Sequence, residues 1–171
     1  MRNYLMILIL VLFAVPVSFS QNSGDAIGIR GGSGNFGYGP EISYQKAIGA
    51  SNQFELDLGW RGNRNFGALS LSGIYHWTWN ITGGLNWYIG PGAQVGFYNY
   101  RRYEPGHPYW DDDYPESGLL LAVGGQIGLE YDFNVHGAPI QLSIDSRPMW
   151  GFFNYYRGFG YGGALGLRYT F

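Results

Sequence analysis

The sequence predicts an all-β protein, an eight-stranded antiparallel up-and-down transmembrane β-barrel. Three observations lead to this fold. Eight segments alternate apolar and polar residues, charged residues make up only 13% of the 171 residues, and aromatic residues make up 19%. A period of two is the pattern of β-strands with one apolar and one polar face. Soluble domains carry about 25% charged residues, so this chain lacks the surface of an ordinary soluble protein.

The eight alternating segments are residues 25–32, 41–47, 53–62, 68–80, 85–98, 119–132, 139–149 and 161–171. The third segment is the clearest. Its large apolar residues, from Phe54 to Trp60, alternate with charged residues from Glu55 to Arg61. Successive side chains of a strand point to opposite faces, so each segment predicts a strand with one face toward the barrel interior.

The first twenty residues differ from the rest of the chain. Arg2 supplies a positive charge, residues 4–13 are all apolar, and two serines near the end have the spacing of small residues that a signal peptidase requires. This order is typical of a secretory signal peptide. The apolar run is shorter than the roughly 20 residues of a membrane-spanning helix. We expect a signal peptide over residues 1–20 and one barrel domain over residues 21–171.

The remaining composition excludes several classes of protein. There is no cysteine, so the chain has no disulfide framework, no thiolate metal site and no lipid-modified cysteine. A net charge of −2 provides no basic surface for nucleic acid. We therefore expect no nucleic-acid partner and no cofactor. After residue 20 the chain also has no long apolar segment, and only helices and closed barrels satisfy their backbone hydrogen bonds in lipid.

The same alternation would fit a soluble ligand-binding barrel, in which the apolar face points inward. Two features favour the membrane. The polar faces are rich in Gly, Ser, Asn and Gln, which suits a narrow interior. The apolar faces carry aromatic residues near the strand ends, as in the girdles at membrane interfaces. These residues are Trp60, Trp77, Trp79, Trp87, Phe97 and Tyr169.

The connections between segments are expected to alternate between short turns and longer loops. The longest are residues 99–118 and 150–160. Outer-membrane barrels have short periplasmic turns and longer extracellular loops. With an even number of strands, both ends of the mature chain then lie on the periplasmic side. Two prolines interrupt the pattern. We expect a bulge at Pro91 and an end to strand pairing near Pro148.

The last six residues, GLRYTF, resemble the assembly signal of outer-membrane proteins, and the matching positions are Leu167, Tyr169 and Phe171. With the strand count, residues 21–171 resemble the small OmpA/OmpX-type eight-stranded outer-membrane barrels. They are most similar to uncharacterised barrels with a GLEY-like sixth strand, a D-x-R-P seventh strand and a GLRY-like last strand. The resemblance implies export to the outer membrane, with its lipids and the barrel-assembly machinery as partners. It implies no particular activity.

The charged residues on the polar faces are candidate functional residues. Eight strands leave an interior just wide enough for side chains to fill, and a buried charge must be paired. We therefore expect a lumenal salt-bridge network of Arg30, Glu55, Asp57, Arg61, Glu130, Asp132, Asp145, Arg147 and Arg168. Arg30 and Arg168 are expected to neutralise Glu55, Asp57 and Glu130. The alternative is a narrow small-solute channel.

An enzyme is a second alternative, because a lipid-modifying barrel would need a serine, a histidine and an acid. Ser70, Ser72 and His76 share one face of a strand. His76 is four and six residues from the serines, or roughly 13 and 20 Å at the rise of a strand. Direct contact is therefore not expected, and we predict no catalytic residue and no enzyme.

The two long loops carry the remaining candidates. Asp111, Asp112 and Asp113 supply carboxylates of the kind that Ca²⁺ prefers, but their spacing matches no EF-hand, so a solvated acidic loop is the preferred interpretation and no metal site is predicted. Residues 150–161 are rich in aromatic side chains. They mark either a contact site or the membrane interface. The sequence thus favours a non-enzymatic barrel with a structural or surface-interaction role through loops 99–118 and 150–160.

Overall fold

A computed structural model describes residues 24–34, 37–49, 51–62, 66–100, 117–152 and 157–171. The expected signal peptide and Asp111–Asp113 lie outside these residues. The strands, with one short 3-10 helix (η1), are β1 (Ala26–Gly34), β2 (Gly37–Ala47), β3 (Asn52–Gly62), β4 (Phe66–Thr82), β5 (Leu85–Tyr100), β6 (Ser117–Asp132), η1 (Phe133–His136), β7 (Ile140–Ser146), β8 (Met149–Gly151), β9 (Gly158–Gly160) and β10 (Gly163–Thr170). Among the described residues, no helix is both long and apolar enough to span a membrane.

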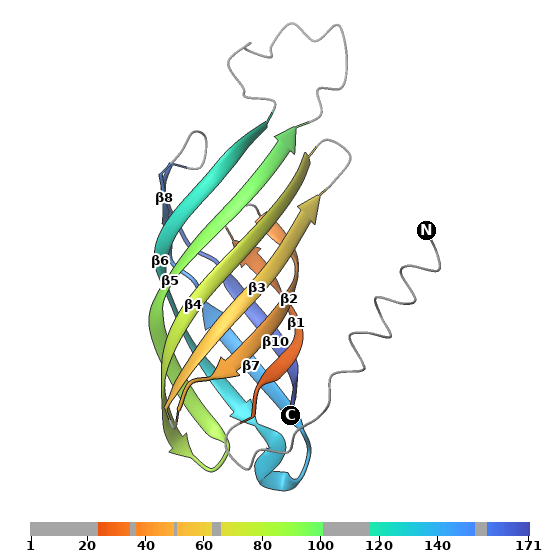
Figure 1. Ribbon diagram of the computed structural model, residues 1–171, viewed down its shortest axis with the longest axis vertical. Helices are drawn as coiled ribbons and strands as arrows, with labels where there is room; N and C mark the ends of the chain where they lie inside the picture. Colours follow the sequence, from red (N-terminus) through yellow and green to blue (C-terminus); the bar gives the residue numbers. More distant parts are fainter. Residues whose placement is uncertain (1–23, 35–36, 50, 63–65, 101–116, 153–156) are drawn as a thin grey trace, which may run out of the picture.

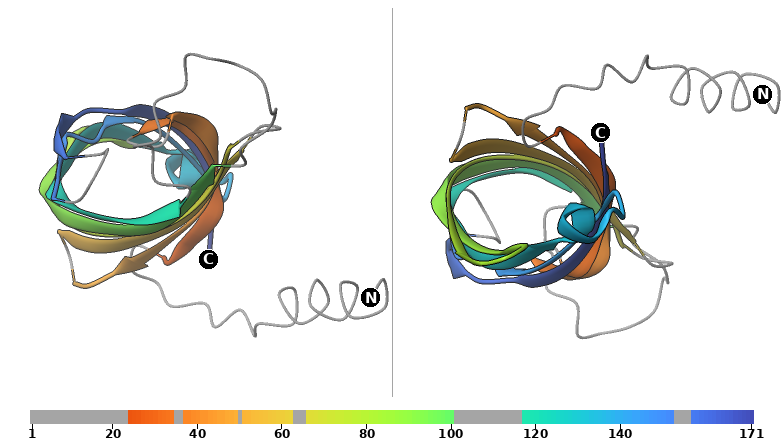
Figure 2. Two further views of the ribbon diagram at one scale, coloured as in Figure 1. Left: turned by 90° about the horizontal axis from the view of Figure 1, so that it is seen from above. Right: turned by 90° about the horizontal axis from the view of Figure 1, so that it is seen from below.

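The strands form one closed antiparallel barrel (Figure 1, Figure 2). Each of β1 to β6 pairs with the next strand along the chain, β7 pairs with β6 and β10, and β10 pairs with β1. The two described ends of the chain meet at one end of the barrel, where the backbone N–H of Phe171 donates to the carbonyl of Asp25 at 2.9 Å. Closure gives each strand of the barrel wall a neighbour on both sides, and within the described residues only the short β9, at the far end, keeps one unpaired edge.

Ten strand segments make eight barrel strands, because β8 continues β7 and β9 continues β10. Ile127 faces Ser146 of β7, and Gly124 faces Met149 of β8, so both segments keep one register against β6. The strand is interrupted at residues 147–148, as expected near Pro148, but pairing does not stop there, because it resumes at Met149 in the same register. The Pro148 carbonyl still accepts a hydrogen bond from the Gly125 N–H at 3.0 Å, since proline lacks only the donor.

The bulge expected at Pro91 is also wrong. The register of β4 and β5 is the same on both sides of it, with Ile74 facing Gly92 and Trp77 facing Ile89. The register shifts farther along instead, between Asn80 and Thr82. Gly90 allows the unbroken register, because a Cβ at this position would collide with the carbonyl of Tyr75 on β4. The close backbone approach therefore depends on the missing side chain.

The connections at the two ends of the barrel differ less in length than the sequence predicts. At the end that holds the chain termini, β4 and β5 are joined through Gly83, whose φ is 51°. At the opposite end, β1 and β2 are separated only by residues 35–36, and β3 and β4 only by residues 63–65. The observed strands extend beyond the predicted ones at that end and absorb the expected loops. Long connections at the far end therefore remain only after β5 and β8.

The barrel is polar inside and apolar outside. On β3, Leu56, Leu58 and Trp60 are exposed, at 39%, 41% and 46%, whereas Glu55 and Asp57 are fully buried. This is the reverse of a soluble protein, in which charged residues are almost never fully buried unless paired. The period of two therefore sorts side chains to the lumen and to the outer surface, and the apolar face is the outer one.

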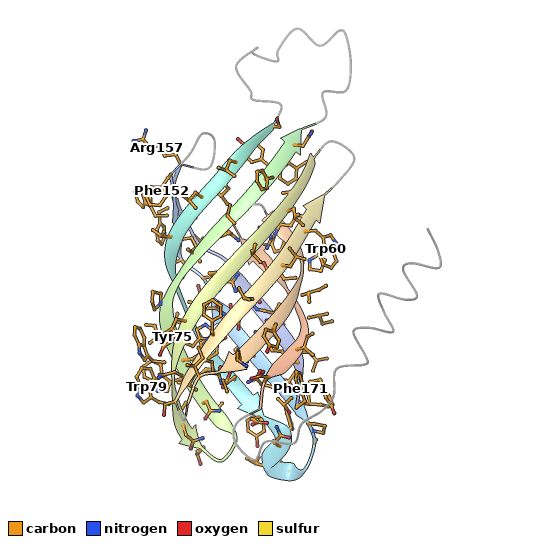
Figure 3. All side chains as sticks on the ribbon, in the orientation of Figure 1. Trp60, Tyr75, Trp79, Phe152, Arg157 and Phe171 are labelled. Atoms are coloured by element: carbon orange, nitrogen blue, oxygen red, sulfur yellow. The ribbon has the colours of Figure 1, made fainter. Side chains whose placement is uncertain are left out.

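Aromatic side chains lie near both ends of this outer surface. Figure 3 shows Trp79 and Phe171 toward the end with the chain termini, and Trp60 and Phe152 toward the opposite end. On β5, Trp87 and Phe97 are ten residues apart, about 33 Å at roughly 3.3 Å per residue. A strand tilt of about 40° reduces this to about 25 Å, the height of the apolar band in outer-membrane barrels. All six aromatic residues predicted as girdles are exposed.

Candidate functional site

The charged side chains of the lumen form the candidate functional site. Nine are buried, and they come from β1, β2, β3, β6, β7, β10 and the residue that follows β7. They are Arg30, Glu41, Glu55, Asp57, Arg61, Glu130, Asp145, Arg147 and Arg168. Alternation places each on the inner face of its strand. On β1, for example, Arg30 is 2% exposed and the preceding Ile29 is 64% exposed.

Arg30 occupies the centre of the network. Its Nη1 lies 2.9 Å from a carboxylate oxygen of Glu41 and 2.8 Å from one of Asp57, and its Nη2 lies 2.5 Å from Asp145. Glu55 is 3.4 Å from Nη1. The guanidinium thereby connects β1 with β2, β3 and β7. Planar guanidinium groups suit this role because they donate in several fixed directions.

Two further arginines cross the lumen toward β3. Nη2 of Arg168 lies 2.6 Å from Glu55, and its other nitrogens donate to Ser43 and Ser143 at 3.0 Å. Nη2 of Arg147 contacts Asp57 and lies 3.2 Å from Glu55. These pairs join β10 and the segment after β7 to the strand on the far side. The side chains therefore fill the lumen in the way expected of an eight-stranded barrel.

Arg61 lies toward the opposite end from the chain termini, and its partner was missed by the sequence analysis. Its Nη2 is 2.7 Å from Glu41, which also pairs with Arg30. Glu41 begins a predicted strand and shares its parity with Ser43 and Gln45. Because Ser43 and Gln45 face the lumen, this shared parity predicts that Glu41 faces the lumen as well.

Two of the predicted network residues form no ion pair among the described residues. Asp132, at the end of β6, accepts a hydrogen bond from the N–H of Asn134 at 2.9 Å and caps η1. It is only half-buried, because the strand leaves the lumen there. Glu130 is 2% exposed, yet it forms no ion pair among the described residues. Neither Arg30 nor Arg168 pairs with it directly, because both reach Glu55. Arg168 is linked to Glu130 only through the amide of Gln141, which accepts from Nη1 of Arg168 at 3.4 Å and donates to Glu130 at 3.0 Å.

Glu130 is surrounded by amides. Nε2 of Gln141 donates to its Oε2 at 3.0 Å. Nε2 of Gln53 and Nδ2 of Asn86 reach its Oε1 at 3.3 and 3.5 Å. Hydrogen bonds from neutral amides are weaker than those from guanidinium groups. Glu130 is therefore the least well compensated carboxylate of the lumen.

A small hollow of about 20 Å³ lies beside the network. Arg30, Glu41, Arg61, Asp145 and Arg147 line it, together with small residues of β1 and β10. A volume of this size holds about one water molecule. Side chains therefore fill most of the described part of the lumen.

His76 lies in the lumen without a catalytic arrangement. Its ring lies against that of Tyr88, with centroids 4.5 Å apart and the planes tilted by 40°, and neither ring nitrogen has a hydrogen-bond partner among the described residues. The hydroxyl of Ser72 accepts from Gln94 at 3.0 Å, and that of Ser70 accepts from Arg61 at 3.3 Å. The structure therefore brings no serine to His76, which leaves the lipid-modifying enzyme without geometric support.

The end of the barrel opposite the chain termini carries aromatic side chains on the described part of residues 150–161. Trp150 and Phe159 face each other across β8 and β9 and are 52% and 66% exposed. Phe152 and Tyr161 are also exposed, as is Arg157, which Figure 3 shows beside Phe152 at the same end. These aromatic side chains point outward, so the described residues do not cover the barrel mouth.

The predicted assembly signal lies on the outer face of β10. Leu167 and Tyr169 are 47% and 51% exposed, and the rings of Tyr169 and Phe171 lie 6.5 Å apart. Alternation places all three outward at the end with the chain termini.

A polar clasp joins the start of β1 to β2 at the same end. The carboxylate of Asp25 accepts hydrogen bonds from the Tyr44 hydroxyl at 2.8 Å, from Nζ of Lys46 at 3.3 Å and from the N–H of Ala47 at 3.2 Å. Burial by itself raises the pKa of Asp25, but these hydrogen bonds outweigh it and lower the pKa below its ordinary value. The ionised carboxylate therefore favours the folded barrel.

Replacing Asp25 by asparagine is expected to lower the free energy of unfolding modestly at neutral pH and not at acid pH. Because the folded-state pKa is depressed, the contribution is complete above the unfolded value of about 3.9 and is lost as the pH falls through the folded value. Urea unfolding of both proteins at pH 7 and near pH 2–3 checks this. An equal difference at both pH values would show that the ionised form does not matter.

Comparison with known proteins gives structural relatives only. No family model matches the chain, and no curated protein matches it. The chain is similar to the N-terminal β-barrel domain of Pseudomonas aeruginosa OprF, with 17% identity and a TM-score of 0.56, over 88% of this chain and 98% of that domain. It is equally similar to Neisserial surface protein A (NspA), with 17% identity and a TM-score of 0.56, over 87% and 95% of the two chains.

Identities this low carry the fold and not the activity. The closed eight-stranded antiparallel arrangement, the outward apolar surface and these two relatives agree. The chain therefore has the fold of the small eight-stranded outer-membrane β-barrels.

Proposed function

We propose that this chain is a non-enzymatic outer-membrane barrel with a structural or surface-interaction role, exported by a signal peptide over residues 1–20. The observation that carries the proposal is the inverted burial. Large apolar side chains are exposed all around the barrel, whereas Arg30, Glu55 and Arg168 are buried. A surface of this composition is stable against lipid and not against water.

The filled lumen supports an interaction role over transport. Ion pairs from β1, from β10 and from the residue that follows β7 meet on β3 and fill the interior. We infer that contacts with partners are made outside the lumen, through loops 99–118 and 150–160. The exposed aromatic residues Trp150 and Phe159 support this, because such clusters mark interaction or membrane surfaces.

Two measurements on cells that express the full chain test the proposal. The protein should fractionate with outer membranes, and its unboiled form should migrate differently from its boiled form on a gel, as folded barrels do. Trypsin added to intact cells should cleave after Arg101 or Arg102 in the long loop. The matched control site is Lys46, at the opposite end of the barrel, which should be protected until the cells are permeabilised.

Each outcome is decisive for a different part of the proposal. A single gel band in the soluble periplasmic fraction would reject the membrane location. Cleavage at the loop only after permeabilisation would invert the orientation and remove the surface role. Deleting residues 101–116 should leave the gel shift intact, because the paired strands do not depend on that connection.

A further inference from the structure

The hairpin made by β7 with β8 and by β9 with β10 fixes the depth of the residues around Arg157. Tyr169 faces Ile140 and Phe159 faces Trp150, so the register is the same at both ends of the hairpin. Tyr169 and Phe159 are ten residues apart, about 33 Å at roughly 3.3 Å per residue. A strand tilt of about 40° reduces this to about 25 Å, the height of the apolar band. Phe159 and Trp150 therefore lie at the boundary of that band, at the end opposite the chain termini.

Arg157 lies just beyond this boundary. It precedes Phe159 by two residues and shares its parity, so it belongs to the outer face. The same register, continued by one residue pair, places it opposite Phe152, and Figure 3 shows the two side chains together. Two residues span about 6.6 Å along a strand, or about 5 Å after the tilt. Because the headgroup layer on each side of a bilayer is about 5–8 Å thick, Arg157 lies at the level of the lipid headgroups.

No described carboxylate neutralises Arg157. Its side chain is exposed and forms no ion pair among the described residues. The described carboxylates lie either in the lumen, as Glu41 does, or at the end with the chain termini, where Asp25 and Asp132 are. The exposed cation of that end is Lys46, which pairs with Asp25 at 3.3 Å. Arg157 therefore presents an unmatched positive charge to the headgroup layer.

The backbone of β9 supplies a further donor on its open edge. Arg147 and Gly162 exchange both of their backbone hydrogen bonds, at 2.8 and 3.3 Å. Such pairs alternate with pairs that exchange none along antiparallel strands, so Phe159, three residues farther along, directs its N–H away from β8. Within the described residues no strand pairs with β9 on that side. The edge of a sheet with free N–H groups suits an anion.

We propose that Arg157 and the N–H of Phe159 bind the phosphate group of an anionic membrane lipid, whose acyl chains pack on the exposed rings of Trp150 and Phe159. Guanidinium groups bind phosphate oxygens through two parallel hydrogen bonds. The two rings are 52% and 66% exposed and lie on the hydrocarbon side of the guanidinium. They favour a lipid over free phosphate, because an inorganic ion gains nothing from apolar rings. The proposal rests on the proposed membrane location and names a ligand for this end of the barrel.

Native mass spectrometry of the full mature chain in maltoside micelles tests the proposal. The added lipids are phosphatidic acid, which carries a phosphomonoester, and phosphatidylcholine with the same acyl chains, in which a cationic group neutralises the phosphate. Phosphatidic acid should bind about tenfold more tightly, the fold-change expected for one charge-assisted hydrogen bond. Inorganic phosphate at the same concentration should not compete. In NMR spectra of the nitrogen-15-labelled protein, the backbone amide signal of Phe159 should shift with phosphatidic acid and not with phosphatidylcholine.

Two variants and a matched control locate the site. Arg157→Gln should weaken the binding of phosphatidic acid about tenfold and leave that of phosphatidylcholine unchanged. Phe159→Ala removes an exposed ring and keeps the N–H, so it should weaken the binding of both lipids by similar factors. Lys46→Gln is the matched control, because it removes the exposed cation of the opposite end and should change neither affinity. All three side chains lie outside the lumen, so the gel shift of the folded barrel should persist.

Four outcomes would contradict these expectations. Equal affinities of the unchanged protein for the two lipids would overturn the proposal, even with a normal gel shift. Competition by inorganic phosphate would refute a lipid as the ligand. Equal losses in Arg157→Gln and Lys46→Gln would show a general attraction of charge without a site. Absence of the gel shift from the unchanged protein would instead reject the membrane barrel itself, so the two failures are distinguishable.

Discussion

Replacing Arg30 by methionine is expected to destabilise the barrel by about 3–5 kcal/mol, the cost of removing one partner from a buried ion pair. Arg30 contacts Glu41, Asp57 and Asp145 at 2.9, 2.8 and 2.5 Å. The substitution leaves these carboxylates in the lumen with fewer opposite charges. Urea unfolding of the protein in lipid vesicles, followed by tryptophan fluorescence, measures the loss.

A second substitution should recover part of that loss. Arg30 is the only cation that pairs with Asp145 among the described residues, so Asp145→Asn in the Arg30→Met background removes a carboxylate that has lost its partner. The double variant should therefore be more stable than Arg30→Met alone, a coupling that additive effects would not give. The surface control is Lys46→Met. Its side chain is 59% exposed and pairs with Asp25, and such pairs contribute about 0–1 kcal/mol.

A loss of less than 1 kcal/mol for Arg30→Met would contradict the network as described. It would mean that solvent enters the lumen and screens the remaining carboxylates. The same outcome would favour the alternative function, a narrow small-solute channel, because a solvated lumen can pass ions. Conductance across a planar bilayer, close to zero for the unchanged protein, then distinguishes a loosened network from an open pore.

Replacing Leu58 by arginine is expected to destabilise the folded barrel by about 2–4 kcal/mol in lipid bilayers, the cost of a basic side chain at the midplane of the lipid-facing surface. Leu58 is 41% exposed and lies on β3 between Leu56 and Trp60, within the apolar band. In bilayers its surroundings are hydrocarbon, so a guanidinium group must either leave the band or draw water into it. Reversible unfolding from vesicles measures the change.

The matched control is Ile48→Arg. Ile48 is 47% exposed, close to the value of Leu58, but it lies in the turn between β2 and β3 at the end of the barrel. The cost there should be about 0–1 kcal/mol, as for sites near the interface. Equal and small effects at both positions would mean that the outer surface faces water. Because Leu58 and Ile48 are nearly equally exposed, a larger loss of stability at Leu58 would reflect its depth in the membrane.

The sequence predicts the lumenal set well because a strand has a period of two. Once a single strand is oriented, the direction of every other side chain on it follows. Parity alone places Arg30, Glu55, Asp145 and Arg168 inside. The same rule places Glu41 inside, because it shares the parity of Ser43 and Gln45.

The partners of these residues could not be predicted in the same way. Arg30 meets Asp145, 115 positions away, and Arg168 meets Glu55, 113 positions away. Which inward side chains share a level depends on the tilt and stagger of the strands around the barrel. Those quantities are properties of the closed sheet and leave no local trace in the chain. The indirect link between Arg168 and Glu130 and the wrong place for Asp132 both result from this.

The prolines illustrate a further limit. Pro91 and Pro148 lack a donor wherever they occur, and the sequence correctly marks the missing hydrogen bonds. Whether the register shifts is decided by the neighbouring strands. Pro91 stays paired with Gly125 on β6, and β7 and β8 keep one register against β6 on either side of Pro148.

Alternation, low charge and aromatic placement by themselves determine an eight-stranded barrel with a polar interior and an apolar exterior. Each of these is a local property, since the polarity of each residue indicates whether it faces the lumen or the outer surface. The tertiary structure alone decides that four arginines saturate four carboxylates and leave Glu130 among amides. Electrostatic pairing acts across the lumen between residues far apart in the chain, so only closure of the barrel determines which charges meet.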